Sequence, residues 1–169
     1  MKKSSFNMLI LVLLGFVGVA HADKKSVDLT KTVIVRPFEN SVKGASGLPE
    51  AVRSAVVGTL KDEGVTAFLT AEEAKDKGKT AMLELTGRLV DFAAGNAAKR
   101  LMVGFGSGRA HAGFEFTMKD AATGETVWQK TVKQTASFWF NGTTSSSAER
   151  SELPEGVARK LVQELKKER

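Results

Sequence analysis

Small residues alternate with large or polar ones between positions 103 and 114, and this pattern constrains the fold more than any other feature. Every second position from 104 to 112 is glycine or alanine. A period of two is typical of a β-strand, whose successive side chains point to opposite faces. Glycine weakens a strand by roughly 0.5–1 kcal/mol relative to alanine. The column of Gly104, Gly106 and Gly108 therefore predicts a strand face that a helix approaches closely.

A second alternating stretch, from Thr80 to Phe92, determines which face is buried. Its odd-numbered positions are mostly leucine or small, and its even-numbered positions include polar residues. Directly paired residues share a face of the sheet. Pairing the leucine face with the glycine face leaves the polar residues outside, whereas the other parity buries two basic side chains at a cost of several kcal/mol. We therefore expect one outward face to gather Glu84, Arg88, Ser107, Arg109 and His111.

Three further segments have the composition of strands. The β-branched run 32–38 ends near a proline, and 65–70 is a short apolar run. The segment 126–140 is expected to return from a hairpin turn that Asp120 opens and in which Gly124 supplies a positive φ. The aromatic residues at 138–140 are expected to pack in the core or to form a docking edge.

Apolar residues recur at helical spacing over 48–63 and again from Leu153 to Leu165. Both segments begin with Leu-Pro-Glu, a small residue and valine. This shared phrase is explained either by a duplicated strand–helix unit or by two amphipathic helices with the same start signal, and we favour the second. A charged stretch, 71–77, is expected as one or two exposed helical turns capped by Thr70.

Together these elements predict the fold class. We expect residues 23–169 to form a single α+β domain, with a mixed, mostly antiparallel sheet of about five strands and two amphipathic helices packed on one face.

Residues 1–22 have the three-part pattern of a secretory signal peptide. Lys2 and Lys3 precede an uncharged apolar run, and Ala20 and Ala22 flank a cleavage site. The run is shorter than the roughly 20 residues that a membrane-spanning helix needs. We therefore expect cleavage after Ala22, a periplasmic mature protein and no membrane span after cleavage.

Composition excludes several classes of function. The chain has no cysteine, so it has no thiolate metal site, no thiol nucleophile and no lipidated cysteine, and we expect that it is not a lipoprotein. After cleavage His111 is the only histidine, which excludes a multi-histidine site, and no calcium-loop pattern occurs. We expect no metal, no cofactor and no catalytic group. The net charge is +6, but export argues against a nucleic-acid partner.

The order of motifs between Leu85 and Gly124 resembles a known family. A Gly-Arg-Leu-Val-Asp-Phe strand is followed by Asn96, Arg100, the glycine motif and an Asp-x-x-Thr-Gly turn. This progression, strongest over 80–140, is similar to the bacterial domain-of-unknown-function family 4410, whose members are exported envelope proteins and often lipoproteins. The resemblance implies an envelope location and an α+β domain, and it adds Asn96 and Arg100 to the candidate binding residues. It implies no activity.

The sequence thus favours a non-enzymatic binding or assembly module whose partner is an envelope protein or an anionic envelope polymer. Two alternatives stay open. One is a self-assembling envelope component, in which the glycine-rich hairpin is a homo-oligomer interface or inserts into a membrane. The other is a small hydrolase that uses His111.

Overall fold

A six-stranded mixed sheet forms the centre of the computed structural model, which describes residues 26–95, 109–136 and 152–168. The strand order is β3-β1-β4-β5-β6, and β2 pairs with β4 beyond the end of β1. β1 is parallel to β3 and β4, whereas β4, β5 and β6 form an antiparallel meander. The strands are β1 (Val33–Val35), β2 (Glu39–Asn40), β3 (Ala67–Phe68), β4 (Leu83–Ala94), β5 (Ala110–Asp120) and β6 (Thr126–Thr135).

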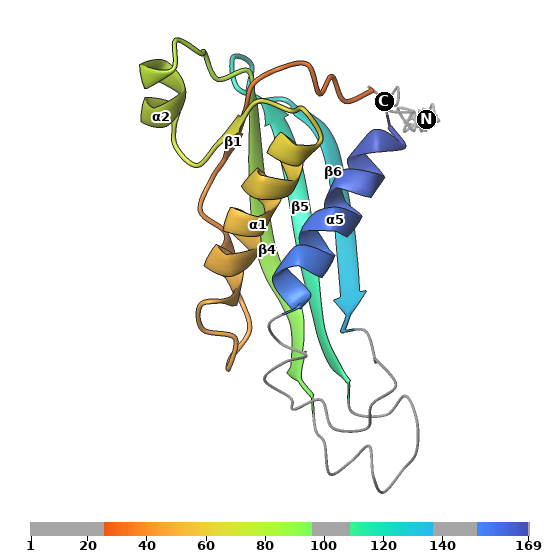
Figure 1. Ribbon diagram of the computed structural model, residues 1–169. Coiled ribbons are helices and arrows are strands. Elements are labelled where there is room, and N and C mark those ends of the chain that lie inside the picture. Colours follow the sequence, from red (N-terminus) through yellow and green to blue (C-terminus); the bar gives the residue numbers. More distant parts are fainter. Residues whose placement is uncertain (1–25, 96–108, 137–151, 169) are drawn as a thin grey trace, which may run out of the picture.

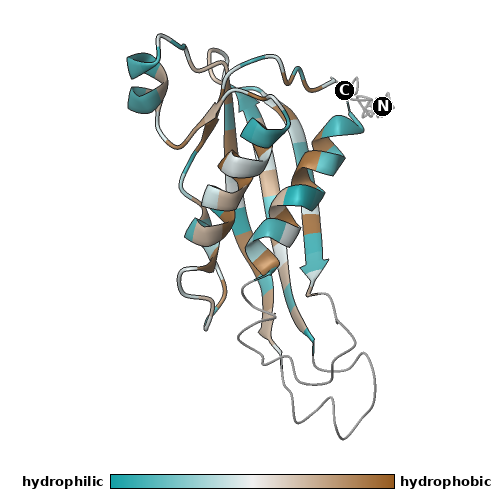
Figure 2. Cartoon of the chain, in the orientation of Figure 1, coloured by the Kyte–Doolittle hydropathy of each residue, from teal (hydrophilic) through white to brown (hydrophobic). Residues whose placement is uncertain are grey.

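Two helices lie side by side on one face of this sheet, α1 (Leu48–Asp62) and α5 (Leu153–Lys166) (Figure 1). Both have proline in the first turn, where a missing N–H costs nothing. A third helix, α2 (Ala71–Asp76), lies away from them and is largely hydrophilic in Figure 2. The predicted α+β class is confirmed, with six strands where about five were expected.

The buried face of the sheet follows the predicted parity. Leu85 lies opposite Met118 and Leu89 opposite Phe114, and all four side chains are fully buried. The opposite parity would have buried charged residues. Branched side chains of both helices complete the core: Val52, Val56, Leu60, Val157, Leu161 and Leu165.

A β-bulge between Leu89 and Asp91 corrects the expectation of one uninterrupted alternation along β4. Beyond the bulge, Asp91 lies opposite Gly113 and Phe92 opposite Ala112. A bulge inserts one extra residue, so it reverses which positions of the strand face the core. The side chain of Asp91 consequently joins the outward face and that of Phe92 turns toward the core.

Gly104, Gly106 and Gly108, which form the expected glycine column, lie outside the described residues. The two alanines that continue the column, Ala110 and Ala112, are both buried. The aromatic residues at 138–140 also lie outside the described part of the chain.

The first predicted strand is interrupted where Pro37 occurs. β1 ends at Val35, and the chain rejoins the sheet as β2, alongside Arg88 and Leu89 of β4. Between the two strands, Phe38 packs its ring 5.5 Å from that of Phe116, edge to face. Such aromatic pairs contribute about 0.5–1.5 kcal/mol beyond the area that they bury.

Gly58 is expected to be a weak point of α1 that alanine repairs. It is an exposed position inside the helix, and a Cβ built there meets no atom within 4 Å. Gly58→Ala should therefore stabilise the domain by about 0.5–1 kcal/mol, since alanine loses less backbone entropy in a helix. A urea-unfolding midpoint at or below that of the wild type would contradict this expectation.

Glu164 links α5 to β6 and should make the stability of the domain depend on acid. Its carboxylate accepts hydrogen bonds from Lys130 of β6 and from Lys167, and these lower the pKa of Glu164 to about 2. A depressed pKa stabilises the folded state above the usual value near 4.5, and this contribution disappears as the pH falls through about 2. Comparing urea midpoints at neutral pH and at pH of about 3, the wild type should lose more stability than Glu164→Gln. If the wild type and Glu164→Gln lose the same stability between the two pH values, the assignment of this acid dependence to Glu164 is wrong.

Candidate functional site

The face of the sheet opposite α1 and α5 carries no helix among the residues described, and we call it the open face. Its side chains alternate with the buried ones along each strand, so the sequence pattern itself places them there. Most of them are polar or charged on all three long strands, and the exceptions include Ala93 and Gly113. The polar and charged residues of the open face are Glu84, Thr86, Arg88, Asp91, His111, Glu115, Thr117, Lys119, Gln129, Thr131, Lys133 and Thr135.

An ion pair between Arg88 and Glu115 lies near the middle of the open face. The two residues are directly opposite each other, and Arg88 Nη2 is 2.5 Å from Glu115 Oε2. This hydrogen bond, followed by the charges of Glu115 and Glu39, raises the pKa of Arg88. Because both side chains are substantially exposed, the pair contributes little to stability. The Arg88–Glu115 pair is therefore not required mainly for stability, and its charges are available to a ligand or partner.

A shallow depression of about 390 Å³ adjoins the Arg88–Glu115 pair. Hydroxyl, amide, ammonium and carboxylate groups surround it, which gives a ligand both donors and acceptors. The depression is lined by Pro37, Glu39, Thr86, Gly87, Arg88, Glu115, Thr117, Lys119 and Gln129.

A second ion pair lies nearer to β1, between Glu84 and Arg36. Arg36 donates a hydrogen bond to the Glu84 carboxylate, and this bond raises the pKa of Arg36. Glu84 also lies opposite Lys119 on β5. The Glu84 carboxylate thus contacts Arg36, and Lys119 is the cross-strand neighbour of Glu84 on the other side.

The third charged group of the open face is centred on Asp91. His111 Nε2 lies 3.4 Å from Asp91 Oδ1, and Lys133 Nζ lies 3.8 Å from Asp91 Oδ2. Gly113 on β5 lies directly opposite both Asp91 on β4 and Lys133 on β6. A Cβ on Gly113 would be 3.1 Å from the Asp91 Cβ and 3.5 Å from the Lys133 Cγ. A larger residue at 113 would push this ion pair apart. Glycine therefore permits the close approach of aspartate and lysine across β5.

The structure does not bring the predicted site residues into one cluster. Glu115, the partner of Arg88, and His111 are four residues apart on β5, which corresponds to about 13 Å. Arg109 is half-buried immediately before β5. Sequence reasoning missed Asp91 and Lys133, because the bulge that turns Asp91 outward leaves no pattern in the sequence. The predicted residues Asn96, Arg100 and Ser107 lie outside the described part of the chain.

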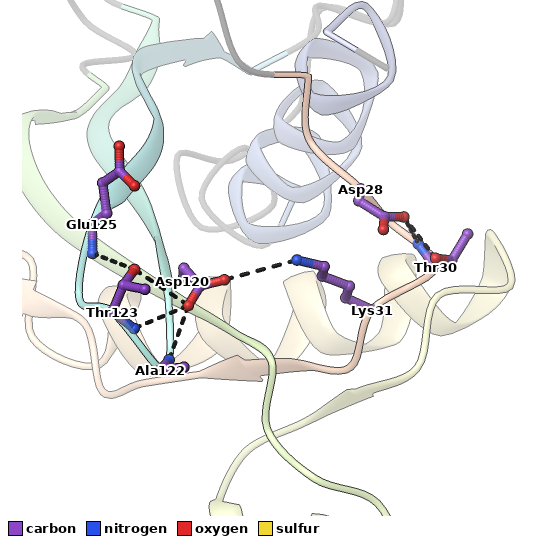
Figure 3. Close-up of polar contacts among 7 residues, drawn as sticks. All are labelled: Asp28, Thr30, Lys31, Asp120, Ala122, Thr123 and Glu125. Carbon is purple, nitrogen blue, oxygen red and sulfur yellow. Dashed lines mark hydrogen bonds and ion pairs between the residues drawn. The ribbon is translucent and has the colours of Figure 1, made fainter.

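Asp120 ends β5 and opens the turn to β6 (Figure 3), and Gly124 lies within that turn. Asp120 Oδ1 accepts hydrogen bonds from the backbone N–H groups of Ala122 and Thr123, and these bonds lower the pKa of Asp120. Lys31 Nζ lies 3.7 Å from Asp120 Oδ2. Gly124 has a φ of 72°, which favours glycine. The contacts of both residues stabilise the turn.

Across residues 26–95, 109–136 and 152–168, histidine and carboxylate side chains form no group of three that could hold a metal ion. Within those ranges, the helices are also too short or too polar to cross a membrane.

A family model described as "Domain of unknown function (DUF4410)" matches residues 38–142. No curated protein matches the chain.

Three solved structures share the fold at low sequence identity. The PelC dodecamer from Paraburkholderia phytofirmans is 19% identical, with 80% of this chain and 90% of that one covered at a TM-score of 0.52. The hypothetical protein CT253 from Chlamydia trachomatis is 8% identical, with 82% and 97% covered and a TM-score of 0.54. Protein XCC0632 from Xanthomonas campestris is 10% identical, with 80% and 82% covered and a TM-score of 0.52. These likenesses extend to the fold alone.

Proposed function

The chain belongs to the family described as Domain of unknown function (DUF4410), and we propose that it is a non-enzymatic binding module of the bacterial cell envelope. In this proposal the leader of residues 1–22 directs export, the mature protein is periplasmic, and the absence of cysteine means that it is not lipid-anchored. The partner is an envelope protein that contacts the open face.

One observation carries the proposal: the open face holds ordered charged pairs that the fold does not need for stability. The Arg88–Glu115 and Glu84–Arg36 pairs are exposed or half-exposed, so each contributes little to the stability of the domain. Each pair fixes the orientation of a guanidinium and a carboxylate, and the Arg88–Glu115 pair does so beside the polar depression. Side chains oriented in advance lose less entropy when a partner binds.

The balance of charge favours a protein over an anionic polymer as the partner. Each carboxylate on β4 and β5 of the open face lies beside a cation: Glu84 beside Arg36, Asp91 beside Lys133 and Glu115 beside Arg88. A surface of alternating sign is complementary to another surface of alternating sign. A polyanion would instead favour an excess of positive charge.

The test exchanges the charges of the central pair. The double variant Arg88→Glu with Glu115→Arg keeps an ion pair, so its melting temperature should remain within about 4 °C of the wild type. Chemical cross-linking in intact cells should capture an envelope protein with the wild type and lose it with the double variant. Lys75→Glu, on α2, is the matched control and should keep the cross-link.

Two results would reject the proposal. One is a partner that the charge-exchanged variant retains. The other is full-length protein that fractionates with the cytoplasm and keeps residues 1–22. The second result rejects export and leaves the open face to be judged by the first.

A self-assembling component is the second candidate. PelC, which has a similar fold, is described as a dodecamer. In that protein the fold is compatible with assembly. In this candidate, the glycine-rich hairpin around Gly106 that the sequence predicts is the interface between protomers. Sedimentation of the mature protein with and without detergent tests it, because a strict monomer in both conditions removes this candidate.

The third candidate is a small hydrolase that uses His111. His111 has Asp91 as its carboxylate neighbour, at 3.4 Å. A histidine oriented by a carboxylate is a general base in many hydrolases. If His111→Ala leaves the cellular phenotype of the protein unchanged, this alternative is rejected.

A further inference from the structure

The outer side of β6 is an edge of the sheet, and no strand pairs with it in the described parts of the chain. The N–H of Ala136 donates to the carbonyl of Ala110. In an antiparallel ladder the backbone groups of successive residues point alternately toward and away from the partner strand. Even-numbered residues of β6 therefore bond to β5. The N–H and C=O groups of Gln129, Thr131, Lys133 and Thr135 point away from it.

Side chains of the protein already donate hydrogen bonds to two of these outward carbonyl oxygens. Lys160 Nζ on α5 lies 2.7 Å from the carbonyl oxygen of Lys133, and Gln134 Nε2 lies 2.9 Å from that of Thr135. The outward N–H groups have no such side-chain acceptors within the described ranges. The edge therefore offers mainly donors, which suit a ligand that brings carbonyl oxygens.

Positive charge is concentrated along the same edge. Lys130 and Lys133 belong to β6, Lys160 lies on α5, and Lys167 directly follows α5. Glu164 bonds to Lys130 and Lys167, and Asp91 lies 3.8 Å from Lys133. The charge of Glu168 also acts on Lys130, so four lysines face three carboxylates and one positive charge is in excess. The excess attracts an acidic ligand and repels a second copy of the same edge.

We propose that the outer edge of β6 receives an extended acidic segment of a partner polypeptide as an added strand. The carbonyl groups of the segment accept the outward N–H groups of β6, as in other cases of strand addition. Its carboxylates lie beside the lysines, and Lys160 leaves the Lys133 carbonyl to meet one of them. Lysines on a free edge also discourage indiscriminate pairing. This surface shares Gln129 with the depression beside Arg88, but the pairing proposed here does not involve Arg88 or Glu115.

The probe is a fluorescent peptide of about eight residues that alternates glutamate with threonine or valine and is blocked at both ends. Fluorescence anisotropy measures its binding to the mature protein at low salt, and binding should weaken as salt is added. Replacing glutamate by lysine in the peptide should abolish binding. Lys133→Glu combined with Lys160→Glu should also abolish it, while Lys75→Glu, near the other edge of the sheet, should not.

Backbone pairing is tested separately from charge. Thr131→Pro removes an N–H that points away from β5, so the ladder within the sheet stays intact. It should weaken peptide binding about tenfold, whereas Thr131→Val should not weaken it. In the unmodified protein, the peptide should slow amide exchange at Gln129, Thr131 and Lys133, a readout that does not depend on how well the proline variant folds.

Three results would overturn the proposal. The first is no binding of the glutamate peptide at low salt. The second is binding that leaves the exchange of the outward amides unchanged, because the contact would then be charge alone. The third is a dimer of the peptide-free protein that Thr131→Pro dissociates, because the edge would then belong to a second copy. Charge exchange at Arg88 and Glu115 should leave peptide binding unchanged, so the open-face proposal fails or survives independently.

Discussion

Replacing Gly87 by valine is expected to destabilise the domain by about 2–3 kcal/mol. Gly87 lies on the buried face of β4, opposite Phe116. A Cβ built on Gly87 would lie 3.0 Å from the Phe116 Cε1 and 3.0 Å from the Phe38 Cδ1. Both rings pack against each other, so neither has room to retreat without disturbing the other. Valine adds two further methyl groups to this crowded position.

Chemical denaturation followed by circular dichroism measures this effect. Gly87→Ala should lie between the wild type and the valine variant, because it adds only the Cβ. Gly58→Ala, which adds the same atom in open space, should move stability in the opposite direction. A valine variant as stable as the wild type would mean that Phe38 does not pack over β4.

The same close approach shows how far the sequence predicts this core. Alternation along β4 and β5 predicts that Leu85 and Leu89 meet the even-numbered side chains of β5, because the charged residues have to stay in water. It also places Gly87 on the buried face. It does not predict Phe38, because that ring comes from an irregular segment between β1 and β2. The packing of a loop residue depends on the completed sheet, which no local pattern encodes.

The two helices illustrate the same division. Their shared opening phrase predicts both starting points, because proline and an acidic residue suit the first helical turn. The phrase differs at one position, with Ala51 in α1 and Gly156 in α5. A Cβ at Gly156 would be 2.9 Å from the Gln134 Cγ of β6, whereas Ala51 is exposed. The glycine thus marks the closer contact of α5 with the sheet, and only the structure identifies its partner.

The candidate site was predicted less completely than the fold. Polar residues alternate with apolar or small ones along β4 and β5, so the sequence predicts that Glu84, Arg88 and His111 share the outward face. Their partners depend on the register between strands, and a single bulge changes that register. It brings Asp91 to the open face and gives His111 a carboxylate neighbour. A bulge depends on how two strands pair and is therefore invisible to a pattern read along one strand.

Replacing Arg53 by leucine is expected to destabilise the domain by about 2–4 kcal/mol. The helical spacing of α1 gives no reason to bury an arginine, yet the Arg53 side chain is only 10% exposed. Its Nε donates to the carbonyl of Val35 at 3.0 Å, and its Nη2 donates to the carbonyl of Leu69 at 2.6 Å. The guanidinium therefore joins α1 to β1 and to the segment after β3. Leucine fills much of the space and leaves both carbonyls without a donor.

The lost hydrogen bonds, and not the ion pair, should account for this effect. Glu50, which also contacts Arg53, is 60% exposed and stays hydrated when the guanidinium is removed. Glu50→Gln should therefore change the free energy of unfolding by less than about 1 kcal/mol. Arg53→Lys should be intermediate, because one ammonium cannot reproduce the planar set of donors that spans both carbonyls. If Glu50→Gln destabilises the domain as much as Arg53→Leu does, the ion pair is the stabilising contact and the assignment to the carbonyls is wrong.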